Sequence, residues 1–126
     1  MPGRYVGGNR HRAAGPRSID AVIAGHVHLF EMVSYSTSQP TQFISGNGGA
    51  WADVPLPRPL PLGATPAAGA TVQSIVSTNR PGFLLLERDR TAANAWRIEA
   101  RDRRGDPLTT CVLAEQKTRC APEALR

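Results

Sequence analysis

The segment over residues 53–70 constrains the fold of this chain most, because it carries proline at every second position from 55 to 61. Each proline lacks a backbone N–H donor and has a fixed φ, so neither a helix interior nor a central strand accommodates such a run. We therefore predict a long, semi-extended surface loop or linker here. A chain of 126 residues has the size of one domain, so we expect the loop to interrupt a single folded body over residues 18–126.

Three short apolar runs before this loop have the composition of β-strands. Residues 19–24 read Ile-Asp-Ala-Val-Ile-Ala, an almost continuous apolar run that predicts a strand buried on both faces. Residues 30–35 and 42–45 predict two more strands, and the glycine-rich cluster at 46–49 predicts the turn that ends the last of them.

Four further strands are predicted after the loop, over residues 71–77, 82–87, 95–101 and 108–113. In the third of these, apolar and charged residues alternate, as they do in a strand with one face in water. Gly105 then provides a turn, since glycine adopts positive φ readily. The second half is thus expected to be an antiparallel meander, and no segment shows a helical pattern.

Charge and hydropathy exclude several classes of protein. The formal net charge is +5, but basic and acidic residues alternate along the chain and aromatic residues are only 6%, which argues against nucleic-acid binding. No apolar run approaches the roughly 20 residues of a membrane span. Residues 1–17 are rich in Arg and Gly, lack acids, and do not form the apolar core of a secretory signal. We expect a disordered leader there.

Two cysteines, Cys111 and Cys120, lie close together near the C-terminus. A tight loop or short hairpin between them would bring their Cα atoms within the roughly 7 Å that a disulfide requires. The sequence leaves two interpretations open, a disulfide in an oxidising compartment or two free thiols.

The chemistry concentrates in Gly25-His26-Val27-His28, directly after the first predicted strand. Residues two apart in an extended segment project to the same side, so His26 and His28 are expected to present both imidazoles to one cavity. Imidazole is a common metal ligand, and the carboxyl ends of buried strands are frequent positions for functional sites. Two ordinary surface or packed histidines are the alternative interpretation.

The order of these elements adds to the motif. A strand reading Asp-Ala-Val-Ile-Ala is followed by Gly-His-Val-His-Leu-Phe-Glu, and about 15 residues later by Gln-Phe-Ile-Ser-Gly-Asn-Gly-Gly-Ala. This order resembles the end of the catalytic domain in calcineurin-like metallophosphoesterases, particularly their purple-acid-phosphatase-like branch. The strand at 82–87, Trp96, the Gly105 turn and a final strand are similar to that family's closing strands.

The resemblance implies a dinuclear metal site that hydrolyses phosphate esters, with His26 binding one ion and His28 the other. Zinc, iron or manganese suits imidazole ligands. The implied fold class is α+β, mostly β: the C-terminal half of a two-sheet αββα sandwich, with an antiparallel meander and a long Pro-rich loop. The resemblance and the cysteines favour a periplasmic or extracellular location for the complete protein.

Several family motifs do not occur in this chain. The Asp-x-His, Gly-Asp-x-x-Asp and Gly-Asn-His-Asp/Glu segments that supply the other ligands are missing, and His11, within Gly-Asn-Arg-His, does not replace them. Two ions repel each other without bridging carboxylates, so we expect at most one ion, bound weakly, and no activity of this chain alone. We infer a truncated gene product, a pseudogene-like remnant or a wrongly assigned start. We expect its apolar strands to favour self-association through exposed edges. The alternative is a non-catalytic β-rich interaction or structural module.

Four polar residues near this motif have ordinary explanations. Asp20 is expected at a strand entry rather than behind an imidazole ligand. Glu31 and Asp53 are expected to be solvated rather than to reach a metal. Asn47 is expected to occupy a turn that needs positive φ.

Overall fold

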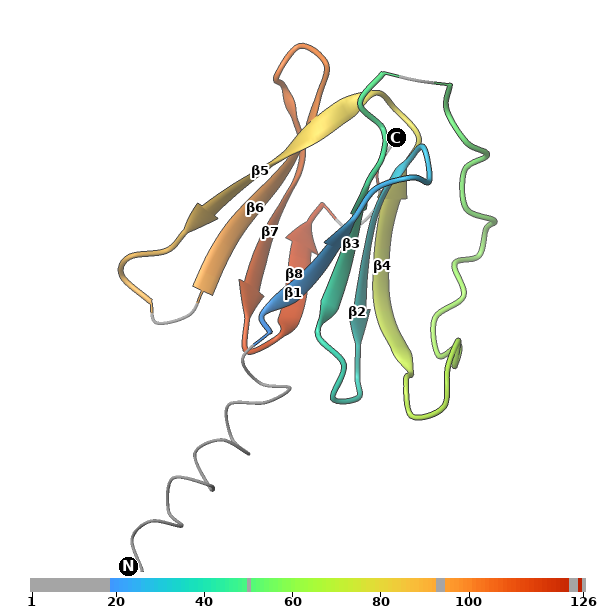
Figure 1. The fold of residues 1–126 in the computed structure, drawn as a ribbon, viewed down its shortest axis with the longest axis vertical. Coiled ribbons are helices and arrows are strands. Elements are labelled where there is room, and N and C mark those ends of the chain that lie inside the picture. The colour runs from blue at the N-terminus through green and yellow to red at the C-terminus, as the bar shows by residue number, and fades with distance from the viewer. Residues whose placement is uncertain (1–18, 50, 93–94, 123–124, 126) are drawn as a thin grey trace, which may run out of the picture.

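The computed structural model describes residues 19–49, 51–92, 95–122 and 125. The expected leader over residues 1–17, which includes His11, lies outside these ranges. The described residues form two four-stranded β-sheets packed face to face and no helix (Figure 1). The α component of the expected fold class is therefore wrong for this part of the chain, whereas its mostly β character is confirmed. The same residues contain no helix with the length and hydropathy that a membrane crossing needs.

The first sheet has the strand order β1-β3-β2-β4. Its strands are β1 (Ala21–Ala24), β2 (Phe30–Tyr35), β3 (Thr41–Ser45) and β4 (Val72–Thr78). β1 runs parallel to β3, while β2 is antiparallel to both β3 and β4. The three strands predicted before the Pro-rich segment are thus present, and β4 joins them rather than the later strands.

The second sheet is the antiparallel meander β5-β6-β7-β8. Its strands are β5 (Gly82–Arg88), β6 (Ala95–Asp102), β7 (Pro107–Ala114) and β8 (Lys117–Ala121). The meander that we expected is confirmed from β5 onward, and β8 is an additional strand that the pattern did not predict. Gly105 has a φ of 92° in the turn between β6 and β7, as expected.

A tight two-residue turn explains why β8 was missed. Glu115 and Gln116 both have positive φ, 52° and 68°, which is the conformation of a type I′ hairpin turn and normally favours Asn and Gly. The turn is held from outside, because the Gln116 carbonyl accepts hydrogen bonds from both the N–H and the hydroxyl of Thr41, at 3.0 and 2.8 Å. Hydrogen bonds from Thr41, which is distant in sequence, therefore stabilise a turn that lacks the usual Asn and Gly.

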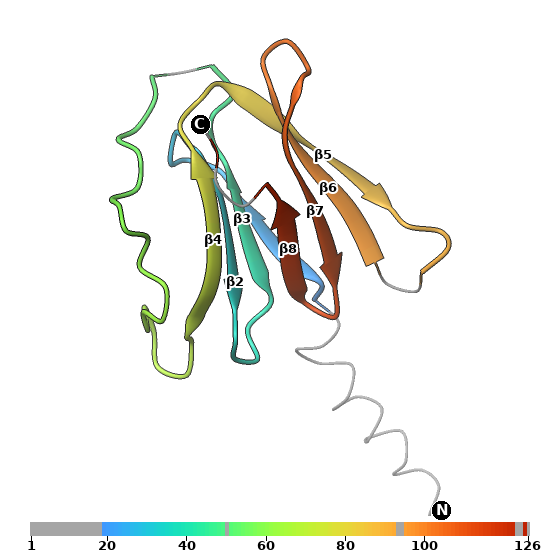
Figure 2. The same cartoon turned by 180° about the vertical axis from the view of Figure 1, so that it is seen from behind.

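The main core lies between the two sheets. Phe30, Met32 and Phe43 on the first sheet pack with Ile98 and Leu113 on the second, and all five are almost completely buried. The structure contains a disulfide between Cys111 and Cys120, which are directly opposed on β7 and β8 with a Cα–Cα distance of 4.0 Å. Seen from behind, β8 faces the first sheet (Figure 2), where the Thr118 N–H donates to the Ser34 hydroxyl at 3.2 Å.

The Pro-rich segment covers part of the outer face of the first sheet. It runs along the outside of β4 (Figure 1), and Leu56 and Leu60 pack against a second apolar cluster of Val33, Val72 and Ile75. The backbone of Val72 is also hydrogen-bonded to this segment in both directions, to Gly63 and to Ala64. The predicted surface loop is thus partly a cover for β4.

β1 differs most from its prediction. We expected a strand buried on both faces, but among the described residues β1 is an edge strand that pairs with β3 alone, and Val22 and Ile23 remain 43% and 55% exposed. The prediction is wrong because continuous apolar composition shows that a strand is suited to burial, whereas burial itself depends on which elements lie beside it.

Candidate metal-binding loop

Four connections meet at one end of the molecule. Because β1 and β3 are parallel, their carboxyl ends lie at the same end of the first sheet. This places residues 25–29, which we call the His loop, beside the glycine-rich residues 46–49. The β4–β5 connection and the β6–β7 hairpin reach the same end, at the top of Figure 1. The predicted position of the motif, directly after the first strand, is thus confirmed.

The His loop is not extended. The Val27 N–H donates to the Gly25 carbonyl at 3.0 Å, and the Leu29 N–H donates to the Val27 carbonyl at 2.8 Å. These bonds close two successive three-residue turns, centred on His26 and His28. His26 has a φ of 79°, so the first is the rare, strained form of the γ-turn. The expected extended backbone is therefore wrong for this segment, so strand alternation does not determine the relative directions of the two imidazoles.

His28 is held by three hydrogen bonds to the segment that follows the glycine-rich turn. Its ring Nδ1 lies 2.7 Å from the Trp51 carbonyl oxygen. Its backbone N–H donates to Asp53 Oδ2 at 2.6 Å, and its carbonyl accepts the Asp53 N–H at 3.1 Å. A carbonyl can only accept, so Nδ1 carries a proton, and in the neutral imidazole the lone pair is then on Nε2. Histidine metal ligands commonly have this arrangement, in which the second nitrogen donates to a carbonyl.

We expected Asp53 to be simply solvated, but in the structure it positions His28. One carboxylate oxygen accepts the His28 N–H, and the Asp53 carbonyl accepts a hydrogen bond from Asn79 Nδ2 at 3.1 Å. Asn79 follows β4, so the clamp on His28 joins two connections that are distant in sequence. Sequence reasoning missed this pairing, because the Pro-rich composition around Asp53 indicates only a loop.

Gly46 is needed for the backbone of the His loop to approach the first sheet. Its N–H donates to the Leu29 carbonyl at 3.1 Å, and a Cβ at this position would lie 1.9 Å from the Val27 carbonyl oxygen. No side chain fits at that distance. Gly46 thus serves a close backbone contact, whereas the sequence had suggested only a turn.

The His loop supplies some, but not all, of the ligands that a metal ion needs. His26 is exposed and no hydrogen bond between described residues involves His28 Nε2, so the loop offers up to two imidazole nitrogens. Among the described residues there is no group of three or more His, Cys, Asp or Glu that could hold a metal ion. A structural zinc site usually has four protein ligands and a catalytic one three. These residues therefore supply part of a coordination shell.

The remaining polar candidates are explained by other contacts. Asp20 accepts a hydrogen bond from the Trp96 indole nitrogen at 3.1 Å and so ties the start of β1 to β6. Glu31 is half-buried on β2, and burial raises the pKa of its carboxyl above the ordinary value. Asn47 does not have the positive φ that we expected; its side chain is buried and donates from Nδ2 to the Arg80 carbonyl at 2.9 Å.

Comparison of the chain with protein-family models, with curated proteins and with solved structures finds no match. The similarity to calcineurin-like metallophosphoesterases thus has no support beyond the motifs quoted from the sequence.

Proposed function

We propose that the His loop provides imidazole ligands to the metal site of a phosphate ester hydrolase, with His26 and His28 as the ligands. The observation that carries this proposal is the clamp on His28, in which the Trp51 carbonyl accepts a hydrogen bond from Nδ1–H and Asp53 holds the backbone. Since the ring orientation and tautomer are set in advance, little ordering is needed when Nε2 binds an ion.

The backbone of His26 supports the same proposal. A non-glycine residue at φ 79° is held in a conformation that costs on the order of 1–3 kcal/mol, and such residues cluster at functional sites. The two hydrogen-bonded turns and the contact with Gly46 keep the loop in this conformation. The exposed imidazole is thereby presented on a fixed backbone rather than on a flexible loop.

The proposed ion is zinc, iron or manganese, all of which accept imidazole nitrogen. A bound ion of this kind supplies Lewis acidity that polarises a phosphoryl oxygen. The described residues contribute at most the two imidazoles, so the other ligands must come from other groups. We therefore expect the described residues alone to bind one ion weakly and to hydrolyse phosphate esters little or not at all.

A second candidate function is that of a non-catalytic β-rich interaction module. The observation in its favour is apolar exposure beside the same loop. Trp51 is 90% exposed and Val54 is 84% exposed, and large apolar side chains gathered at a surface are common where proteins associate. In this case His28 would serve only to hold the 51–53 segment in place.

Metal titration distinguishes the two functions. We expect calorimetric titration with Zn²⁺ to give about one ion per chain, and ¹⁵N NMR to show a shift of the His28 Nε2 signal. Changing His26 and His28 to Ala should abolish binding. Asp53→Ala should weaken it by roughly tenfold, because groups that orient metal ligands typically contribute that much or more.

His11→Ala is the matched control, because it removes the chain's only other histidine and leaves the sequence of the His loop unchanged. Binding that survives the double substitution, or that falls equally in the His11 variant, would contradict the metal proposal and favour the interaction module.

A further inference from the structure

A basic hollow lies at the end of the molecule that also carries the His loop. It has a volume of about 390 Å³ and is lined by Arg80 and Pro81 of the β4–β5 connection and by Asp102, Arg103 and Arg104 of the β6–β7 hairpin. We call it the arginine pocket. Gly82 brings its two walls together, because a Cβ there would lie only 1.9 Å from the Arg101 carbonyl oxygen.

The pocket holds more positive charge than its own carboxylate neutralises. Three arginines and a single acid, Asp102, line it. One oxygen of that acid accepts the backbone N–H groups of Arg104 and Asp106, at 2.9 and 3.0 Å. The other lies 3.5 Å from Arg80 Nη2, longer than the roughly 2.7–2.9 Å of a strong charge-assisted bond. Within the described ranges, neither Arg103 nor Arg104 forms an ion pair with a carboxylate.

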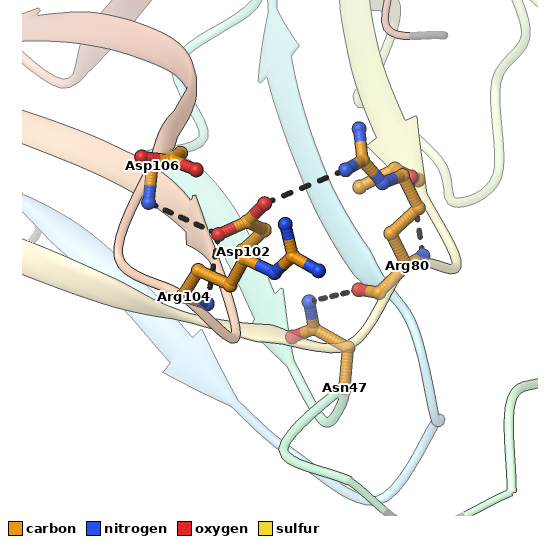
Figure 3. Close-up of polar contacts among 6 residues, drawn as sticks. Asn47, Arg80, Asp102, Arg104 and Asp106 are labelled. Carbon is orange, nitrogen blue, oxygen red and sulfur yellow. Dashed lines mark hydrogen bonds and ion pairs between the residues drawn. The ribbon is translucent and has the colours of Figure 1, made fainter.

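The backbone around Arg80 is fixed, so the pocket does not depend on a loose loop. The Arg80 carbonyl accepts from Asn47 Nδ2 at 2.9 Å, its N–H donates to Thr78 Oγ1 at 3.2 Å, and the Gly82 N–H donates to the Asn47 carbonyl at 2.8 Å. Figure 3 shows Asn47 bonded to the Arg80 backbone, with the Arg104 guanidinium extending from the hairpin toward Arg80.

Asn47 also leaves one polar atom unsatisfied. The residue is only 6% exposed, and its Oδ1 is the one buried side-chain nitrogen or oxygen without a hydrogen-bond partner in the described part of the chain. Buried polar atoms almost always have a partner, so an exception calls for an explanation such as a functional role. The unsatisfied atom here, Asn47 Oδ1, belongs to the residue whose Nδ2 holds the Arg80 carbonyl.

From these observations we propose that the arginine pocket binds a phosphate group, with Arg80 and Arg104 as its principal ligands. A guanidinium presents paired N–H donors that match the oxygens of phosphate, and two such groups balance a dianion. A carboxylate ligand carries a single charge and two oxygens, so we expect it to bind the two arginines more weakly than phosphate does. The pocket needs no metal ion, and its ligand binding is therefore independent of the function proposed for the His loop.

Titration with inorganic phosphate in the presence of EDTA tests this proposal, because the chelator removes any contribution from a metal at the His loop. We expect saturable changes in the side-chain NMR signals of Arg80 and Arg104, and affinity that falls as salt concentration rises. The double variant Arg80→Ala with Arg104→Ala should bind at least tenfold more weakly. Replacing both with Lys should recover only part of the affinity, because charge is kept but the paired donors are lost.

The double variant Arg90→Ala with Arg119→Ala is the matched control, since it removes the same charge from exposed positions outside the pocket. It should bind phosphate as the natural chain does. The proposal is overturned by an equal loss in this control, by the absence of saturable binding, or by acetate binding as tightly as phosphate. Thermal unfolding of each variant identifies any loss of phosphate binding that results from misfolding.

Discussion

Single residues determine the shape of the candidate site at this end of the molecule. His26 adopts a strained backbone conformation, Gly46 permits a contact that no other residue allows, and Asn47 anchors the β4–β5 connection. All three shape the backbone, Asn47 through its side-chain amide, even though the chemistry proposed for the site belongs to imidazole and guanidinium groups. The sequence draws attention to the histidines, while the structure shows that their neighbours set the geometry.

Gly46→Ala is expected to destabilise the fold. The new Cβ would lie 1.9 Å from the Val27 carbonyl oxygen, and both atoms belong to the backbone, so the strand or the His loop must shift. Overpacking of this kind costs about 1–3 kcal/mol, which we expect as a loss in the free energy of unfolding measured with urea. Metal affinity should fall with it, because the same shift moves the His loop.

Gly48→Ala provides the comparison for this substitution. A Cβ at position 48 meets nothing within 4 Å, so its effect should remain within about 0.5 kcal/mol. Equal stability losses in the two variants would show that the close contact with Val27 does not matter.

Among the elements, the β7–β8 hairpin depends most on contacts outside itself. Its turn has two non-glycine residues at positive φ, it is joined to the first sheet through Gln116 and Thr118, and a disulfide links its two strands. β8 is also an edge strand, with β7 as its only neighbour in the sheet. These links compensate for a turn sequence that does not favour a hairpin.

Reduction of the disulfide between Cys111 and Cys120 is expected to destabilise the protein. The bond closes a short loop, with a sequence separation of 9, and loops of this size gain about 2–3 kcal/mol from cross-linking, mainly through the unfolded state. The denaturation midpoint in urea should fall when a reductant is added. A variant with Ala at both positions should show the lower midpoint with or without reductant. The prediction is contradicted if adding reductant leaves the midpoint of the natural chain unchanged.

At the scale of the whole molecule, the two sheets bury one common core but leave apolar surface at their margins. Val22 and Ile23 on β1 are exposed, as are Phe83 and Leu85 on β5, and both strands lie at sheet edges. An exposed apolar edge presents unpaired backbone groups to other chains. The molecule thus combines a well-packed interior with edges suited to pairing.

We therefore predict that the protein self-associates through the free edge of β1. Sedimentation velocity should show species larger than a monomer as concentration rises. Changing Val22 and Ile23 to Lys should restore the monomer, because charged side chains on an edge strand oppose pairing.

The control for this prediction places Lys at Val54 and Leu62, which are also exposed but lie in the Pro-rich segment rather than on a strand edge. A natural chain that stays monomeric at every concentration would refute the prediction, and so would a control that dissociates the assembly equally well.

The sequence alone determined the features that depend on local composition. Seven of the eight strands lie where short apolar or alternating runs are bounded by Gly and Pro, because these residues restrict the backbone wherever they occur. The position of the His loop at a strand end, and the closeness of the two cysteines, likewise followed from order along the chain.

Only the tertiary structure decided the features that depend on partners distant in sequence. The exposure of β1 reflects its place at the edge of the sheet that the described residues form. The sheet to which β4 belongs reflects its pairing with β2. The hairpin at Glu115 and Gln116 relies on Thr41, and the turns of the His loop rely on Gly46 and Asp53. Local preferences are worth a fraction of a kcal/mol per residue, so packing and hydrogen bonds between separate segments decide such cases.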